Sequence, residues 1–384
     1  MAYQLQNVDI DVFLSEYWQK KPCLIRQAFK DFSSPITPDE LAGLACEQEV
    51  HSRLVLEQGG DSPWQLRYGP FEDSDFSPLP ATHYSLLVSE CEKWVPEFAD
   101  LIDQFRFIPD WRIDDLMVSY APPGGSVGPH SDEYDVFLLQ AEGHRHWQYS
   151  DKPVNSPALI PDLDLAIIQT FEFDHAATLA PGDMLYLPPG VAHFGVAVDH
   201  CLTCSIGFRA PTAAEVLESV ALEIGRANLG TRRYTDSRLD TNRHPAEITD
   251  HEITRFKAMV MPLLEQPDTL WQAAIGKLLS DGGMAERDEI EAPTEFKALR
   301  KTRWMKNVDS KMLYHLANDK LQFYCNGEMH ELAANDANLG VIQQLCLQRY
   351  LPPALLDACA SNPALEQLMI NLATCSAILP VDLA

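Results

Sequence analysis

The stretch Gly128-Pro-His-Ser-Asp-Glu-Tyr134 places His130 two residues before Asp132, and the stretch Pro181-Gly-Asp-Met-Leu-Tyr-Leu-Pro-Pro-Gly-Val-Ala-His193 ends on a second histidine. In a β-strand, residues i and i+2 point to the same side, so His130 and Asp132 can hold one ion. His193 would then come from another strand that closes against the first, as in a jelly roll. The two stretches therefore favour a double-sheet jelly roll in which His130, Asp132 and His193 can hold one metal ion.

The chemistry of this trio is informative because two imidazoles and one carboxylate on one face of an ion leave the opposite face open. That arrangement is typical of non-haem iron(II) oxygenases. A His-x-Asp pair alone is a weak signal, since a buried histidine and a turn aspartate can meet by chance. The neighbouring residues therefore have to support the metal interpretation.

Residues 112–209 read as short strands separated by turn sequences such as Ala-Pro-Pro-Gly-Gly and Leu-Pro-Pro-Gly, which is typical of an all-β barrel or sandwich. Strand parity places Asp115, Met117 and Ser119 on one face of the first of these strands. It also makes Arg145 and Trp147 point together.

A buried arginine that faces the metal needs an anionic partner, because an unpaired buried charge is very costly. A dicarboxylic acid would meet that need at Arg145, with Ser119 or Tyr120 adding a hydroxyl. The alternative is a surface arginine paired with one of the 56 acidic residues. His144 and His146 have the opposite parity, so they are not expected to be ligands.

The net charge of −27 argues against a protein whose main task is binding nucleic acid, and it favours cationic partners. Simple solubility is the alternative explanation of this acidity. The nine cysteines have no disulfide spacing, and no apolar run is long enough to span a membrane or to serve as a secretion signal. We expect a cytoplasmic protein.

The composition changes twice, which predicts three domains: residues 1–210, 211–291 and 292–384. Thr212 with Glu215 and Thr249 with Glu252 are capping boxes that open helices in the second part. An apolar stripe follows at helical spacing, and it suits either a core or a dimer interface: Ile253, Phe256, Val260 and Leu263. The third part reads as a short hairpin and three helices, like a winged helix. Its acidic and basic residues nearly balance, so we expect a structural or protein-interaction role there.

The stretches 128–140, 143–147 and 181–193, with Tyr17-Trp-Gln-Lys-Lys-Pro-Cys-Leu-Ile-Arg and Ser205-Ile-Gly-Phe-Arg-Ala-Pro, resemble the JmjC/cupin-type ribosomal oxygenases. The likeness covers essentially the whole chain. It is strongest to the bacterial branch that hydroxylates an arginine of a large-subunit ribosomal protein, number sixteen in the bacterial scheme. That resemblance implies an α+β architecture: a JmjC-type double-stranded β-helix, a helical dimerisation domain and a C-terminal winged helix.

The resemblance also implies roles for individual residues. His130, Asp132 and His193 match the iron(II) ligands. Arg145 matches the residue that binds 2-oxoglutarate, which is used with O₂, and the hydroxyls of Ser119 and Ser205 belong to the same cosubstrate end. At the substrate end, Tyr134 would stack on the target guanidinium and Asp115 would pair with it.

Three other functions use the same features. A JmjC-type demethylase acting on another basic protein would release formaldehyde. A small-molecule hydroxylase would need neither the acidic surface nor two accessory domains. A non-catalytic metal-binding cupin would serve as an adaptor and show no turnover of 2-oxoglutarate.

Overall fold

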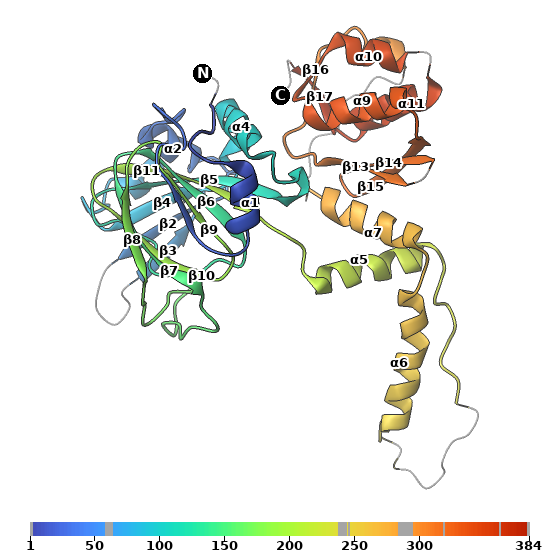
Figure 1. Ribbon diagram of the computed structural model, residues 1–384, viewed down its shortest axis with the longest axis horizontal. Helices are drawn as coiled ribbons and strands as arrows, with labels where there is room; N and C mark the ends of the chain where they lie inside the picture. The colour runs from blue at the N-terminus through green and yellow to red at the C-terminus, as the bar shows by residue number, and fades with distance from the viewer. Residues whose placement is uncertain are drawn as a thin grey trace. The chain divides into compact units, whose positions relative to one another are not determined.

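The computed structural model describes residues 3–57, 64–236, 244, 246–282, 295–317, 319–360 and 362–381 (Figure 1). The chain divides into two compact units, Met1–Ala210 and Pro211–Ala384. The division falls where the composition first changes. The second expected boundary, between residues 291 and 292, lies outside the described residues. Within the part of the chain that the structure describes, no helix is long and apolar enough to cross a membrane.

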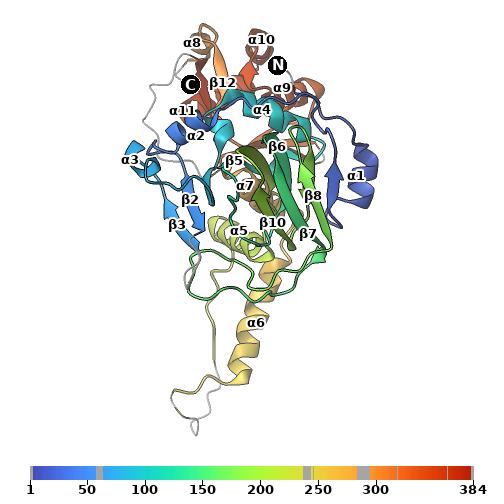
Figure 2. The ribbon, with the colours of Figure 1, turned by 90° about the vertical axis from the view of Figure 1, so that its left-hand side faces the viewer.

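The first unit contains two antiparallel sheets that enclose its interior (Figure 2). The larger sheet has the strand order β1-β9-β6-β11-β5-β4-β2-β3. Its strands are β1 (Cys23–Ile25), β2 (Ser52–Glu57), β3 (Trp64–Tyr68), β4 (Tyr84–Val88), β5 (Ile113–Ala121), β6 (Asp135–Glu142), β9 (Met184–Leu187) and β11 (Cys201–Phe208). The smaller sheet has the order β10-β7-β8, with β7 (Arg145–Pro153), β8 (His175–Leu179) and β10 (Val191–Ala197).

Strand β11 lies between β6 and β5, and all eight of its residues are buried. A strand covered on both faces reads as a continuous apolar run, which explains Cys-Leu-Thr-Cys-Ser-Ile-Gly-Phe. Strands β2 and β3 form a hairpin in antiparallel register.

An aromatic core fills the larger sheet's outer side and is closed by short helices. Helix α1 (Ile10–Glu16) begins at the cap Asp9 and buries Phe13, whose ring lies edge-on to Tyr186 at 4.9 Å. The other short helices of this unit are α2 (Pro38–Leu44), α3 (Asp73–Phe76), α4 (Pro96–Ile102), η1 (Cys91–Lys93), η2 (Asp103–Phe105) and η3 (Asp110–Arg112).

A buried ionic group fixes the start of β6. Asp135 is fully buried and accepts hydrogen bonds from Arg112 Nη2 at 2.8 Å and from the Tyr186 hydroxyl at 2.6 Å. Paired charges and satisfied lone pairs make such burial tolerable. Because Tyr134 directly precedes Asp135, this group anchors the chain as it leaves the candidate site.

The second unit begins with three helices: α5 (Ala213–Arg226), α6 (Asp250–Leu264) and α7 (Asp268–Ser280). Both predicted capping boxes are confirmed, at Thr212–Glu215 and Thr249–Glu252. Helices α5 and α7 pack together through Val220, Ile224 and Ala274.

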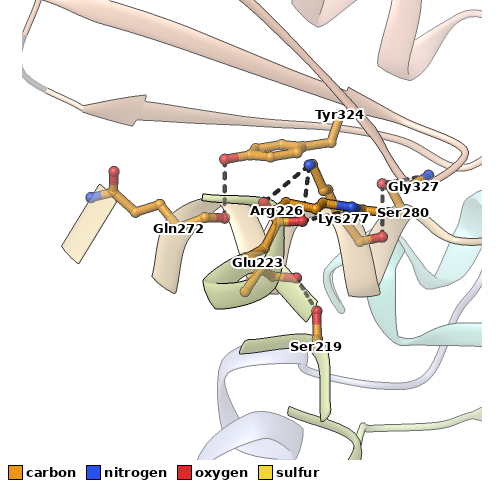
Figure 3. Close-up of polar contacts among 9 residues, drawn as sticks. Ser219, Glu223, Arg226, Gln272, Lys277, Ser280, Tyr324 and Gly327 are labelled. Carbon is orange, nitrogen blue, oxygen red and sulfur yellow. Dashed lines mark hydrogen bonds and ion pairs between the residues drawn. The ribbon is translucent and has the colours of Figure 1, made fainter. Parts of the chain in front are cut away.

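Polar contacts join this helix pair to a three-stranded sheet, as Figure 3 shows. Lys277 on α7 binds both carboxylate oxygens of Glu223 on α5, at 3.0 and 3.2 Å. On the other side of α7, the Tyr324 hydroxyl donates to the carbonyl of Gln272 at 3.1 Å. The sheet is β13 (Met312–Ala317), β14 (Lys320–Cys325) and β15 (Glu328–Ala333). The sequence pattern predicted the first two of these strands and missed the third.

The end of the chain has its own core. Its elements are α8 (Phe296–Leu299), β12 (Trp304–Lys306), α9 (Asp336–Leu347), β16 (Tyr350–Leu351), α10 (Pro353–Cys359), α11 (Pro363–Thr374) and β17 (Ile378–Pro380). Three further helices, α9 to α11, follow the strands as expected. The assignment of this region as a winged helix stays a prediction.

Candidate active site

The structure brings together the three residues that the sequence pattern nominated as metal ligands. His130, Asp132 and His193 each offer one ligand atom, and these atoms all lie within 4.8 Å of one another. Asp132 Oδ2 is 3.6 Å from His193 Nε2 and 3.9 Å from His130 Nε2. One ion can therefore reach all three with small side-chain movements.

Both histidines are held so that Nε2 is free. His130 Nδ1 lies 2.9 Å from the carbonyl of Gly128, and His193 Nδ1 lies 3.0 Å from the carbonyl of Val191. A carbonyl can only accept, so each Nδ1 carries the proton and each Nε2 presents a lone pair. Burial, and then the neighbouring His130, lower the pKa of His193, which keeps this ring neutral. Two neutral imidazoles and a carboxylate form a donor set that fits iron(II).

The prediction that His130 and Asp132 belong to one strand is wrong. His130 makes only an isolated bridge to His193, and β6 begins at Asp135. The carbonyl of Asp132 instead accepts from Gly190 N at 2.7 Å, so this carbonyl bonds a turn and not a sheet neighbour. The ligand side chains therefore converge because the backbone is irregular here, and not because they alternate along a strand.

A cavity of about 250 Å³ opens beside the three residues. Its wall includes residues from both sheets and from the segment that follows β7: Arg53, Val55, Leu87, Met117, Ser119, Val127, His130, Ser131, Asp132, Tyr134, Val136, Leu138, Arg145, Trp147, Leu165, Ala166, Ile167, His193, Thr203 and Ser205. The cavity therefore joins the candidate metal ligands to Arg145, as strand parity indicated.

Among the residues that the structure describes, Arg145 is a buried cation without an anionic partner. Its side chain lies in the cavity wall with 3% of the residue exposed, and no described residue forms a hydrogen bond with its Nε or Nη2 atom. An unpaired buried guanidinium is costly, so an anionic ligand in this cavity would stabilise it strongly. A carboxylate matches the planar fork of donors.

The hydroxyls around this cation come from two adjacent strands. Ser119 on β5 and Ser205 on β11 both line the cavity. Thr203 lines it too and was missed, although it shares the face of Ser205 two residues away. The alternative prediction, that the Tyr120 hydroxyl lies beside Arg145, is wrong. Tyr120 points to the other face of β5, and its oxygen lies 2.7 Å from His200 Nδ1.

The two predicted substrate residues are placed differently. Tyr134 lines the cavity, whereas Asp115 does not, although it shares the face of Ser119 on β5. Asp115 accepts a long hydrogen bond of 3.4 Å from Glu90 N. Burial, with Asp114 and Glu90, raises the pKa of Asp115 to about 6, and Arg53 opposes this shift.

Two parts of the wall were not predicted. The first is Arg53, which lies on β2. Residues Leu165–Ile167 belong to an irregular segment with no periodic signal. His144 and His146 are outside the cavity, as expected, with Nδ1 atoms 2.8 Å from Asp199 Oδ2 and 3.0 Å from Thr178 Oγ1.

Comparison with known proteins agrees with this geometry. Residues 100–216 match the family model of the JmjC domain. The chain is 38% identical to the ribosomal protein uL16 3-hydroxylase of Escherichia coli K12, over 85% of this chain and 87% of that protein. It is 32% identical to a probable ribosomal oxygenase of Haemophilus influenzae, over 92% of this chain and 88% of that protein.

Solved structures extend the similarity to the fold. The crystal structure of E. coli ycfD superposes with a TM-score of 0.83 at 33% identity, over 99% of this chain and 100% of that chain. The E. coli ribosomal oxygenase YcfD in complex with cobalt and 2-oxoglutarate gives a TM-score of 0.78 at 32% identity, over 98% of this chain and 99% of that chain. The predicted cupin-type jelly roll of the first unit is thereby confirmed.

Proposed function

Since this chain belongs to the JmjC-domain ribosomal oxygenases, we propose that it hydroxylates an arginine side chain of the large-subunit ribosomal protein uL16. The enzyme is an oxygenase that uses iron(II), 2-oxoglutarate and O₂. The target protein and the arginine are the proposed part. The observation that carries the proposal is one cavity that joins a His-Asp-His donor set to a buried, unpaired arginine.

The residues of the cavity fit both the metal and the cosubstrate. His130, Asp132 and His193 would hold the iron through Nε2, Oδ2 and Nε2. Arg145 would bind the distal carboxylate of 2-oxoglutarate, with Ser119 and Ser205 as hydroxyl donors. Bound iron supplies the activation of O₂, which these side chains cannot perform themselves.

The protein's contribution is binding, orientation and exclusion of water. Val136 and Leu138 give the cavity an apolar side, and both are buried. The hydrogen bonds from each histidine Nδ1 to a backbone carbonyl fix the ring orientation before any metal binds. This order lowers the conformational cost of assembling the site.

The proposed substrate end of the cavity is the part lined by Tyr134 and Arg53. Tyr134 offers a ring face on which a guanidinium can stack, and Asp115, which does not line the cavity but shares the face of Ser119 on β5, would pair with the guanidinium from outside the wall. The net charge of −27 matches a basic ribosomal protein through long-range steering. Arginine is therefore preferred over a neutral side chain.

A direct test uses the full-length protein. Purified enzyme with iron(II), ascorbate and 2-oxoglutarate is incubated with uL16, and the tryptic peptides are examined by mass spectrometry. We expect one arginine to gain the mass of one oxygen atom. No gain while 2-oxoglutarate is turned over would point to a different substrate, and formaldehyde release would indicate demethylation. Failure of all turnover would favour a non-catalytic metal-binding adaptor.

We also propose that the helical region 211–291 forms a homodimer interface, with the C-terminal region as an accessory module. Helix α6 has no buried residue, and Ile253, Phe256 and Val260 of the predicted stripe are 43%, 46% and 47% exposed. The fourth member, Leu263, packs against the α5/α7 core. An exposed row of apolar side chains on one helix can pack against a second copy of the chain. The proposed site of action is the cytoplasm, where ribosomal proteins are made.

A further inference from the structure

Two side chains of β7 leave buried N–H groups unsatisfied in the same cavity wall. Besides Arg145 Nε and Nη2, the indole Nε1 of Trp147 has no hydrogen-bond partner in the described part of the chain. Both residues line the cavity, and they stand two positions apart on one face of the strand. A buried donor without an acceptor costs about 1–3 kcal/mol, so each of these groups points to an acceptor in the working enzyme.

Trp147 lies between the anion anchor and a candidate metal ligand. The Arg145 guanidinium carbon is 5.6 Å from the centre of the Trp147 ring, and that ring is 5.9 Å from the His193 ring. A group bound between Arg145 and the metal ligands would therefore lie next to the indole. Trp147 itself is 4% exposed, so its position is fixed by packing.

Gly195 on the neighbouring strand makes room for this indole. A Cβ atom at Gly195 would come within 2.6–2.8 Å of Cζ3, Cη2 and Cε3 of Trp147. These atoms form the edge of the indole that is opposite the N–H. The glycine thus allows the ring to lie against β10 with its N–H edge turned away from that strand.

We propose that Trp147 is a cosubstrate-binding residue, whose indole N–H donates to the distal carboxylate of 2-oxoglutarate beside the fork of Arg145. The inference rests on the proposed function, because it needs that cosubstrate. A carboxylate has about four acceptor positions, so it can accept from Arg145 and still take a third donor. This residue would contribute to the preference for a dicarboxylate over a 2-oxo acid with one carboxylate.

The sharpest test removes the N–H without changing the shape of the ring. β-(3-benzothienyl)alanine is incorporated at position 147 of the full-length protein, where sulfur replaces the N–H. The protein is loaded with Mn(II), and binding of 2-oxoglutarate is measured by calorimetry. We expect about a tenfold rise in Kd, the loss typical of one hydrogen bond to a charged group. The same replacement at Trp94, which is 37% exposed, should leave Kd unchanged.

A second ligand locates the contact. 2-Oxopentanoate keeps the oxo acid end and lacks the distal carboxylate, so its Kd should be the same for the variant and the unmodified protein. Unchanged 2-oxoglutarate affinity in the variant, or an equal loss for both ligands, would overturn the assignment of Trp147 alone. If the unmodified protein bound no 2-oxoglutarate, the proposed function would fail as well. Trp147→Phe, checked for thermal unfolding without ligand, gives the same comparison in a variant made by ordinary mutagenesis.

Discussion

His130 and His193 are joined through their backbones: the N–H of His130 donates to the carbonyl of His193 at 3.0 Å, and the N–H of His193 donates to the carbonyl of His130 at 2.8 Å. Two histidines that are far apart in the sequence are therefore placed side by side before any metal binds. Their rings lie 4.2 Å apart between centroids. The backbone pairing therefore positions the two histidines, and their side chains supply the metal-binding atoms.

Asp132→Ala should therefore abolish hydroxylation while the fold persists. The carbonyl of Asp132, which bonds Gly190 N, is unaffected by the change, and the carboxylate itself is partly exposed. We expect the free energy of unfolding of the metal-free protein to change by less than about 0.5 kcal/mol, as at most surface positions. Turnover assays and denaturant titrations measure the two effects. His144→Ala, outside the cavity, is the control and should keep activity. Unfolding of the Asp132 variant would instead indicate a structural role for its side chain.

Arg145→Met should weaken the binding of 2-oxoglutarate without changing the affinity for uL16. Truncating one partner of a buried charge pair costs about 2–5 kcal/mol, which predicts a rise in the KM for 2-oxoglutarate of about 30-fold or more. The apo protein should be more stable than the wild type, because the unpaired guanidinium is removed. Lys152→Met, an exposed change on the same strand, is the matched control. A parallel rise in the KM for uL16 would contradict this division of the cavity.

Asp115 should make substrate binding depend on pH. Burial raises the pKa of Asp115 from 3.8 to about 6, with Asp114 and Glu90 adding to the shift and Arg53 opposing it. The carboxylate pairs with a cation only when ionised, so kcat/KM for uL16 should fall as the pH drops through 6. In Asp115→Asn, kcat/KM should be lower at pH 8, and the part of the pH profile near 6 should disappear.

The raised pKa of Asp115 also affects the stability of the fold: a rise in pH should favour substrate binding but lower the free energy of unfolding. The native state holds this proton more tightly than the unfolded state, so ionisation of Asp115 lowers stability as the pH rises from about 4 to 6. Asp115→Asn should remove that loss. Burial raises the pKa of the neighbouring Glu92 to about 7. Glu92 is unchanged in the variant, so its own contribution to the pH dependence of stability remains. An unchanged pH profile of kcat/KM would exclude Asp115 from substrate binding.

The sequence predicted the parts of the site that lie on regular strands. Arg145 and Trp147 on β7, and Ser119 on β5, alternate over nine residues in each strand, so parity gave their direction correctly. Parity has no meaning between His130 and Tyr134, where the backbone leaves the sheet, and the metal trio was identified there by residue type and spacing. Residues Leu165–Ile167 could not be found, because their place is set by contacts such as Ile168 N to the carbonyl of Pro129 at 2.8 Å.

The exposed stripe of α6 should control the oligomeric state. Phe256→Asp places a charge in the middle of the proposed interface, and a buried unpaired carboxylate opposes association. We expect a monomer by light scattering after size exclusion, with an unfolding free energy per chain that is otherwise little changed, because Phe256 is 46% exposed within one chain. Lys257→Gln, next to it on α6, lowers the net charge by the same amount and should stay dimeric. A monomeric wild-type protein would refute the interface.

The close contact between α7 and the β13–β15 sheet should require glycine, which has no side chain, at position 276. A Cβ atom there would come within 2.3 Å of the Tyr324 ring, and this ring is held by its hydroxyl contacts to Gln272 and Gln322. Gly276→Ala should therefore destabilise the protein by about 1–3 kcal/mol through overpacking, despite the better helix propensity of alanine.

Gly225→Ala on α5 gives the matched comparison. It lies in a helix too, but nothing is within 4 Å of its would-be Cβ, so the same substitution should stabilise by about 0.5–1 kcal/mol. Chemical denaturation of the full-length variants separates the two signs. Equal effects at both positions would mean that the Tyr324 ring moves aside freely, and the contact between α7 and the sheet, whose Tyr324–Gln272 hydrogen bond Figure 3 shows, would then not be rigid. The double variant Gly276→Ala with Tyr324→Leu should recover part of the lost stability, because the ring that meets the new methyl group is gone.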